Sequence, residues 1–120
     1  MHLYSDRVMV IPGFDSLLFY YQDFFSVGQA DFFFEKLLHS TLWNEERISF
    51  YGKSKAVPRL TSWHSKENKS YSYSGVANCS VPYTAVLSYL HFMVENFTGW
   101  KFNSVLLNLY RDGNDSMGWG

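Results

Sequence analysis

The chain has 120 residues, which is enough for one small domain or for the first part of a larger one. Hydrophobic residues make up 47% and aromatic residues 20%, which excludes an intrinsically disordered chain, because disordered segments are poor in aromatic side chains. The net charge is −1, so the total charge gives no argument for a polyanionic partner.

The sequence shows no signal for export or membrane insertion. Charged residues interrupt the first ten positions, and apolar runs such as residues 17–21 are far shorter than the roughly 20 residues that span a bilayer. Cys79 is the single cysteine, so no intrachain disulfide can form, which fits a reducing compartment. We therefore predict a cytoplasmic protein without a membrane segment, and we expect Cys79 to be a small buried or half-buried thiol.

The first part of the chain predicts one short strand and one helix. The strand covers residues 9–14 and contains a Pro-Gly turn signal. Apolar side chains then recur at helical spacing between Gly28, which precedes the helix, and Trp43. The apolar positions of this predicted helix are Ala30, Phe33, Phe34, Leu37, Leu38 and Thr41.

From Arg47 to Gly75 the chain consists of short β-branched or aromatic segments, broken by Gly52, Pro58 and the polar run 64–70. This pattern predicts strands and hairpins. Residues 47–69 also hold six basic side chains against one acidic side chain. The basic residues are Arg47, Lys53, Lys55, Arg59, Lys66 and Lys69. Either a one-sided anionic partner or a solvated loop that is basic by chance accounts for this balance.

The last part predicts a second helix and a long strand. Pro82 opens the helix and Thr98-Gly99 ends it, and residues 102–110 then form a strand followed by a turn at 111–115. The apolar stripe of the helix consists of Tyr83, Val86, Leu87, Leu90, Val94 and Phe97. The whole order indicates an α+β fold. Because nothing follows to pair with the last strand, we expect an unfinished sheet.

The strand at 102–110 has two unlike faces, because side chains alternate along a strand. One face is mostly aliphatic, and the other ends in Asn108 and Tyr110, roughly 7 Å apart by strand rise. If they were buried without partners, this amide and phenol would cost about 1–3 kcal/mol each. Both groups can donate hydrogen bonds, which suits a carboxylate acceptor. Bonds to neighbouring backbone, or an exposed strand end, are the alternatives.

Several segments together carry a resemblance to a known family. They are ISFYGK at 48–53, PRLTSW at 58–63, YSYSG at 71–75, PYT at 82–84 and, most specifically, FNSVLLNLYRDGNDSMGW at 102–119. On these segments the chain resembles the AlkB family of Fe(II)- and 2-oxoglutarate-dependent dioxygenases, especially the bacterial members that remove alkyl lesions from nucleic-acid bases. The resemblance runs from about Val8 to Trp119.

This resemblance implies a fold and a co-substrate site. The fold is the N-terminal part of a double-stranded β-helix (jelly roll) with two flanking helices and a nucleotide-recognition lid, and it is incomplete. The single domain covers residues 1–120, with the lid at 47–81 and the start of the catalytic core at 101–120. Asn108 and Tyr110 are the implied contacts to the carboxylates of 2-oxoglutarate, and Fe(II) is the implied metal of the full-length enzyme.

The resemblance also implies contacts to a flipped-out base. Tyr71 and Tyr73 match the stacking rings of the lid, with Ser74 and Gly75 beside them. Stacking offsets part of the cost of taking a base out of the duplex, and each base–aromatic stack contributes about 1–3 kcal/mol. On the residues alone, two tyrosines on one strand face more often indicate cross-strand packing.

Two further lid residues have two interpretations each. Tyr51 matches an exposed hairpin position that in some relatives wedges into duplex DNA, where a ring can fill the gap left by a flipped base. A tip aromatic without a role in DNA binding is the alternative. Arg59 matches a residue that either holds a phosphate or braces the lid.

The metal motif of the family is missing. After MGW the family continues with His-x-Asp, and a later histidine completes the facial triad that holds Fe(II). Here Gly120 follows Trp119 and ends the sequence. No histidine pairs at i,i+2 or i,i+4 with another ligand, and His64 lies in a polar loop, so we expect no metal ligands in this chain. A truncation, a frameshift or a deliberate fragment would account for this, and we expect the chain to be inactive alone.

Three interpretations remain open at this point. The chain is the N-terminal portion of an AlkB-like oxidative dealkylase that repairs N-alkylated bases in DNA or RNA with Fe(II), O2 and 2-oxoglutarate. It is a non-catalytic nucleic-acid-binding module that retains the lid. Or it does not fold stably alone, because the exposed edge of its last strand invites aggregation. The expected partner is alkylated DNA or RNA, single- or double-stranded, and the expected state is a monomer.

Overall fold

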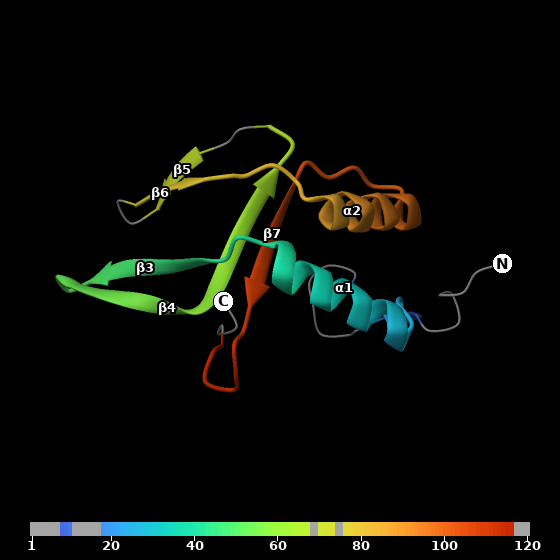
Figure 1. Cartoon of the computed structure of the whole chain (residues 1–120), viewed down its shortest axis with the longest axis horizontal. Coiled ribbons are helices and arrows are strands. Elements are labelled where there is room, and N and C mark those ends of the chain that lie inside the picture. Colours follow the sequence, from blue (N-terminus) through green and yellow to red (C-terminus); the bar gives the residue numbers. More distant parts are fainter. Residues whose placement is uncertain (1–7, 11–17, 68–69, 74–75, 117–120) are drawn as a thin grey trace. The chain divides into compact units, whose positions relative to one another are not determined.

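The structure is a computed structural model that describes residues 8–10, 18–67, 70–73 and 76–116. The chain divides into two compact units, residues 1–38 and 39–120. Within the described ranges, the elements are two helices and three small antiparallel sheets (Figure 1). Both helices have 14 residues, and none in this part of the chain is long and apolar enough to cross a membrane.

The first unit contains a two-stranded sheet and most of a helix. β1 (Val8–Val10) pairs antiparallel with β2 (Phe19–Tyr21), and Met9 lies opposite Tyr20. Residues 11–14 of the predicted first strand lie outside the described residues.

The helix α1 (Val27–Ser40) starts and ends earlier than predicted, so Gly28 lies inside it and Trp43 lies well beyond it. A capping box explains the start. The Ser26 hydroxyl accepts a hydrogen bond from the Gln29 N–H at 3.1 Å, and Gln29 Oε1 accepts one from the Ser26 N–H at 3.0 Å.

The apolar face of α1 is narrower than predicted. Phe33 is buried, and its ring centroid lies 5.1 Å from that of Phe25. Phe34, which we placed in the same stripe, is 56% exposed. Adjacent residues on a helix point about 100° apart, so one narrow packing surface cannot cover both rings.

The second unit is built around a three-stranded antiparallel sheet in the order β3-β4-β7. β3 (Asn44–Phe50) and β4 (Lys53–Ser65) form a hairpin, and β7 (Ser104–Leu109) pairs with the last part of β4. Figure 1 shows β4 as the long strand that lies beside both of the others. The predicted strands and hairpins between residues 47 and 75 are confirmed.

A two-residue turn joins β3 to β4. Tyr51 has φ 50° and Gly52 has φ 74°, and two positive φ angles are what a type I′ hairpin turn requires. Glycine adopts this region freely, whereas tyrosine is rare there. The paired strands on both sides hold Tyr51 in this conformation.

Pro58 does not break the chain, contrary to the prediction. β4 runs through it without interruption, and the register with β3 shifts between Glu45 and Arg47 instead. The shift leaves residues 57–59 of β4 opposite a single residue of β3. Because proline has no N–H to contribute to a ladder, such a bulge is where a strand tolerates it.

The segment after β4 forms a separate two-stranded sheet. β5 (Ser70–Tyr73) pairs antiparallel with β6 (Val76–Cys79). Cys79 is exposed, so the expectation of a buried or half-buried thiol is wrong. Its place at the end of a small sheet, rather than in the main one, leaves it uncovered.

The chain then returns to β4. Val81 forms a parallel bridge with His64, and its N–H donates to the Trp63 carbonyl at 2.9 Å. His64 therefore lies within a strand, with 2% of its surface exposed, and not in a polar loop as predicted.

The helix α2 (Ala85–Thr98) begins three residues after Pro82, which we expected to open it. Thr84 is its N-cap and accepts a hydrogen bond from the Leu87 N–H at 3.3 Å. Gly99, with φ 77°, is a left-handed C-cap, as the Thr98-Gly99 pair predicts. The two helices and the antiparallel sheets agree with the predicted α+β class.

Candidate functional site

β7 separates polar from aliphatic side chains as its alternation predicts. The half-buried face consists of Val105, Leu107 and Leu109. On the other face Leu106 is 54% exposed, Asn108 is exposed and Tyr110 is 44% exposed. Asn108 lies directly opposite Thr61 of β4, and Tyr110 follows the last paired residue. The amide of Asn108 and the phenol of Tyr110, the donor pair, therefore share one open face at the end of β7.

Both groups of the donor pair are exposed at the end of β7, so the burial cost that we considered for them does not arise. An exposed strand end was one of the alternatives that the sequence left open, and the contact to a carboxylate stays a prediction. Their chemistry is unchanged by this. An amide NH2 and a phenolic OH on one strand face can both donate to an anionic ligand that arrives from solvent.

Polar groups of β3 and β4 lie on the same face. The register places Asn44, Thr61 and Asn108 in one row across the three strands. Thr61 is 4% exposed, and its hydroxyl donates to Glu46 Oε1 at 3.3 Å. The Glu46 Oε2 atom lies 4.0 Å from the Arg59 guanidinium. Three strands thus contribute hydrogen-bonding groups beside the donor pair.

Arg59 is enclosed. Its side chain is 14% exposed, and its Nε atom is buried without a hydrogen-bond partner. An arginine in this position beside Glu46 is typical of a brace between strands, the second of the two roles that the sequence left open. The role itself stays a prediction.

Charges within the turn hold the segment that follows Tyr110. Arg111 Nε and Nη2 donate to the two carboxylate oxygens of Asp115 at 2.7 and 3.0 Å, and the Arg111 N–H donates to Oδ2 at 2.9 Å. The side-chain bond to Arg111 lowers the pKa of Asp115, and the same bond raises the pKa of Arg111. The turn predicted at 111–115 is confirmed, and it fixes the direction of the chain directly after the donor pair.

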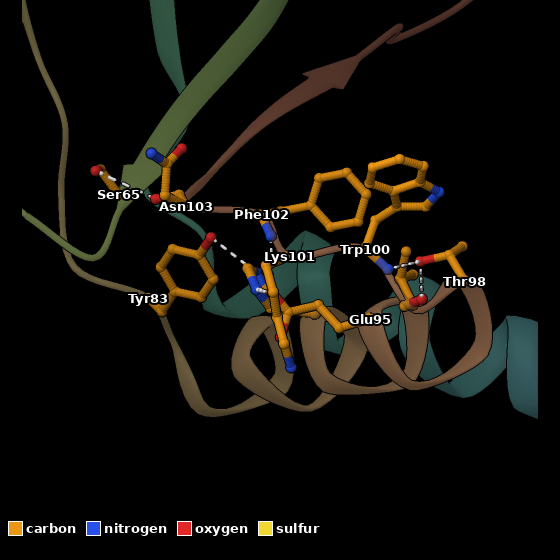
Figure 2. A network of polar contacts seen from close by, with 10 residues as sticks. Ser65, Tyr83, Glu95, Thr98, Trp100, Lys101, Phe102 and Asn103 are labelled. Carbon is orange, nitrogen blue, oxygen red and sulfur yellow. Dashed lines mark hydrogen bonds and ion pairs between the residues drawn. The ribbon is translucent and has the colours of Figure 1, made fainter.

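A chain of polar contacts ties α2 to the segment that leads into β7 (Figure 2). Glu95 Oε2 accepts from the Phe102 N–H at 2.7 Å and lies 2.8 Å from His91 Nε2. His91 Nδ1 lies 2.9 Å from the Tyr83 hydroxyl, and Lys101 Nζ lies 3.8 Å from Glu95 Oε1. The Phe102 N–H, followed by His91, lowers the pKa of Glu95, and burial raises the pKa of Tyr83.

His91 and Glu95 correct one expectation directly. We expected no histidine to pair with a carboxylate at i,i+4, and these two residues do so on α2. The spacing itself was the signal, because residues four apart on a helix are neighbours. The 2.8 Å approach of His91 Nε2 to Glu95 Oε2 is an ion pair only when the imidazole is protonated, and it is not aligned for a hydrogen bond.

His64 is the second buried histidine of this unit. Its Nδ1 lies 3.0 Å from the Pro82 carbonyl, and its Nε2 lies 2.9 Å from the Ser62 hydroxyl. A carbonyl oxygen can only accept, so Nδ1 carries the proton in the first of these bonds. His64 thus fastens the chain after β6 to β4.

The residues of the predicted lid are described in part. Tyr51 lies at the hairpin tip with 90% of its surface exposed, as predicted. Tyr71 and Tyr73 lie in β5, two positions apart and paired with β6. Ser74 and Gly75 lie outside the described residues. The strand character of this segment is confirmed, and the contacts to a base stay predictions.

Comparison with known proteins identifies the class of protein. The family model of the 2OG-Fe(II) oxygenase superfamily matches residues 18–119, and the chain belongs to this superfamily. Within it, similarity to AlkB homologues over most of the chain makes this an AlkB-family dioxygenase sequence.

Two of these relatives are mammalian proteins whose names state an activity. The chain is 33% identical over 114 residues to the alpha-ketoglutarate-dependent dioxygenase alkB homolog 3 of Bos taurus, which covers 94% of this chain and 36% of that protein. It is 31% identical over 101 residues to the DNA oxidative demethylase ALKBH2 of Homo sapiens, which covers 82% of this chain and 39% of that protein. The chain therefore spans little more than a third of the length of these curated relatives.

The superfamily implies Fe(II) and 2-oxoglutarate. The described residues offer donors for 2-oxoglutarate but no ligand group for the iron. Over residues 8–10, 18–67, 70–73 and 76–116, no group of three or more His, Cys, Asp and Glu side chains could hold a metal ion. This part of the chain does not fit the iron. The donor pair suits a diacid in its chemistry, because an amide NH2 and a phenolic OH can both donate to a carboxylate. The helices and antiparallel sheets are consistent with part of the superfamily's fold.

Proposed function

We propose that this chain is the part of an AlkB-type oxidative dealkylase that supplies 2-oxoglutarate contacts and the nucleotide-recognition lid. The observation that carries the proposal is the placement of Asn108 and Tyr110 on one open face at the end of β7, in a chain of the 2OG-Fe(II) oxygenase superfamily. The proposed substrate of the whole protein is an N-alkylated base in DNA or RNA. The names of the relatives, a dioxygenase and a DNA oxidative demethylase, support this.

The finer organisation belongs to the same proposal. The β3-β4-β7 sheet begins a jelly roll, residues 47–81 form the lid, and residues 101–120 open the catalytic core. The protein is a cytoplasmic monomer. We propose that the chain has no turnover by itself, since its described residues contain no cluster of metal ligands.

The donor pair binds and orients the co-substrate. The Asn108 amide and the Tyr110 hydroxyl donate hydrogen bonds to carboxylate oxygens of 2-oxoglutarate, and each bond to a charged group contributes about 1.5–3 kcal/mol. The ion pair between Arg111 and Asp115 holds the backbone just beyond Tyr110 and so limits where the phenol can lie. When bound in the whole enzyme, 2-oxoglutarate supplies two of the electrons that reduce oxygen.

Calorimetric titration of the chain with 2-oxoglutarate tests this function. Asn108→Ala and Tyr110→Phe each remove one donor, and we expect the dissociation constant to rise about 10- to 100-fold in either variant. Leu106→Ala is the matched control, because Leu106 lies on the same exposed face of β7 and donates no hydrogen bond. Equal affinities of all the proteins, or no binding by the unmodified chain, would contradict the proposal.

A non-catalytic nucleic-acid-binding module is the second candidate, and the exposed Tyr51 at the hairpin tip favours it independently of any chemistry. The titration separates the two candidates. Binding of 2-oxoglutarate that depends on the donor pair supports a dealkylase, whereas a binding module has no reason to recognise this diacid.

A further inference from the structure

The cations of the β3–β4 hairpin occupy very different settings. Arg47 is 52% exposed at its side chain, but each of its three nitrogens has a partner: Nη1 lies 2.8 Å from Glu45 Oε1, Nε donates to the Ser54 hydroxyl at 2.9 Å, and Nη2 donates to the Ser54 carbonyl at 3.4 Å. Arg59 is enclosed beside Glu46, with 14% of its side chain exposed. Neither arginine presents a free guanidinium to an outside anion.

Lys53 and Lys55 differ from both arginines. They are exposed on β4 directly after the hairpin turn, and neither side chain bonds to another residue that the structure describes. Their positions are two apart on one strand, so both side chains lie on one face, roughly 7 Å apart by strand rise. In the register of the hairpin, Lys55 lies opposite Ile48 and so shares its face. Arg47 precedes Ile48 on β3 and therefore lies on the other face.

The hairpin tip adds an aromatic ring to this pair of charges. Tyr51, which is 90% exposed, is separated from Lys53 by a single glycine. Two unpaired cations beside an exposed ring suit a ligand with flat π-faces and regularly spaced negative charges. A strand of nucleic acid has both features, and the separation of the two lysines is close to that of successive phosphates along its backbone.

We propose that Lys53 and Lys55 are the phosphate-contacting residues of this hairpin, and that Arg47 and Arg59 are structural. This inference rests on the proposed nucleic-acid substrate and adds to it the residues that hold the strand. It also separates the four basic residues of the β3–β4 hairpin into side chains that face the partner and side chains that stabilise the hairpin.

The salt dependence of binding to a labelled single-stranded oligonucleotide tests this inference. The slope of log affinity against log salt concentration is negative. On a single strand, each lost phosphate contact reduces its magnitude by about 0.7. We therefore expect a reduction of about 0.7 for Lys53→Gln and for Lys55→Gln, and of about 1.4 for the double variant. Fluorescence anisotropy between about 50 and 200 mM salt measures these slopes.

Lys101→Gln is the matched control. Lys101 is also an exposed lysine, with 87% of its side chain accessible, and its loss changes the net charge equally. We expect the slope of this variant to equal that of the unmodified chain. Arg47→Gln should also keep the original slope, because its guanidinium is bound to Glu45 and Ser54.

The possible failures are distinguishable. If the unmodified chain does not bind the oligonucleotide at low salt, the nucleic-acid substrate of the proposed function is overturned together with this inference. If it binds, but the lysine variants keep its slope or the Lys101 variant loses as much, the assignment of the two lysines alone is overturned.

Discussion

Glu95 is the residue on which the contacts between α2 and the approach to β7 converge. The Phe102 N–H, His91 and Lys101 all favour its ionised form, and the Phe102 bond contributes most to the lowered pKa. A carboxyl group whose pKa is lower in the folded than in the unfolded chain stabilises the fold above its unfolded pKa. It loses this effect as the pH falls through its folded value.

Replacement of this carboxylate should therefore matter at neutral pH and not in acid. In Glu95→Gln we expect weaker hydrogen-exchange protection of the Phe102 amide at about pH 7, with the difference disappearing once the pH is below the folded pKa, which lies under the ordinary 4.5. Exchange measured by NMR across this range gives the protection factors. Glu67→Gln, at an exposed position, is the control. A difference that grows in acid would contradict the account.

At the scale of residues, the sequence predicted which side chains share a face better than it predicted whether they are buried. Alternation alone placed Asn108 and Tyr110 on one face, because it depends only on the strand. It could not show that this face is open, which depends on what covers the sheet. The same limit explains His64, whose partner Pro82 lies 18 residues away and whose polar neighbours are typical of a loop.

At the scale of elements, a glycine lies in the first turn of α1 and another directly after α2, and the two have different conformations. Gly99 has φ 77° and ends α2, whereas Gly28 lies inside α1 without a positive φ, and a Cβ at either position would meet nothing within 4 Å. Conformation alone therefore decides the effect of adding a methyl group.

We expect Gly99→Ala to destabilise the last turn of α2 by about 1 kcal/mol, because alanine avoids the left-handed region. Gly28→Ala should instead stabilise the first turn of α1 by roughly 0.5–1 kcal/mol. Residue-specific amide exchange in each helix measures both changes locally. Shifts of the same sign in the two variants would be inconsistent with these assignments.

The sequence predicted the existence of the elements better than their ends, because side-chain caps and a bulge set the ends. Pro82 was a reasonable helix start, but the Thr84 hydroxyl caps α2 two residues later. Ser26 and Gln29 likewise begin α1 before Gly28. Pro58 was a reasonable strand break, yet a bulge absorbs it. Each outcome depends on a hydrogen bond or register that composition does not show.

At the largest scale, few of the large apolar side chains that the structure describes are buried. Among the described large apolar side chains, only Phe33 and Leu87 are exposed by 9% or less, whereas Phe92 and Trp100 are 63% and 72% exposed. A chain that is 47% hydrophobic usually buries more than this. This pattern is consistent with the interpretation that the polypeptide does not fold stably alone, which stays a prediction. For that reason the predicted effects are best read with local probes.

The central claim is that Asn108 and Tyr110 form a site for the carboxylates of 2-oxoglutarate. An NMR titration that follows the side-chain amide signals of Asn108 tests it most directly. We predict that these signals shift and saturate with added 2-oxoglutarate, and that Tyr110→Phe weakens the titration about 10-fold or more. Asn108 signals that stay unchanged, while the ligand binds elsewhere or not at all, would contradict the claim.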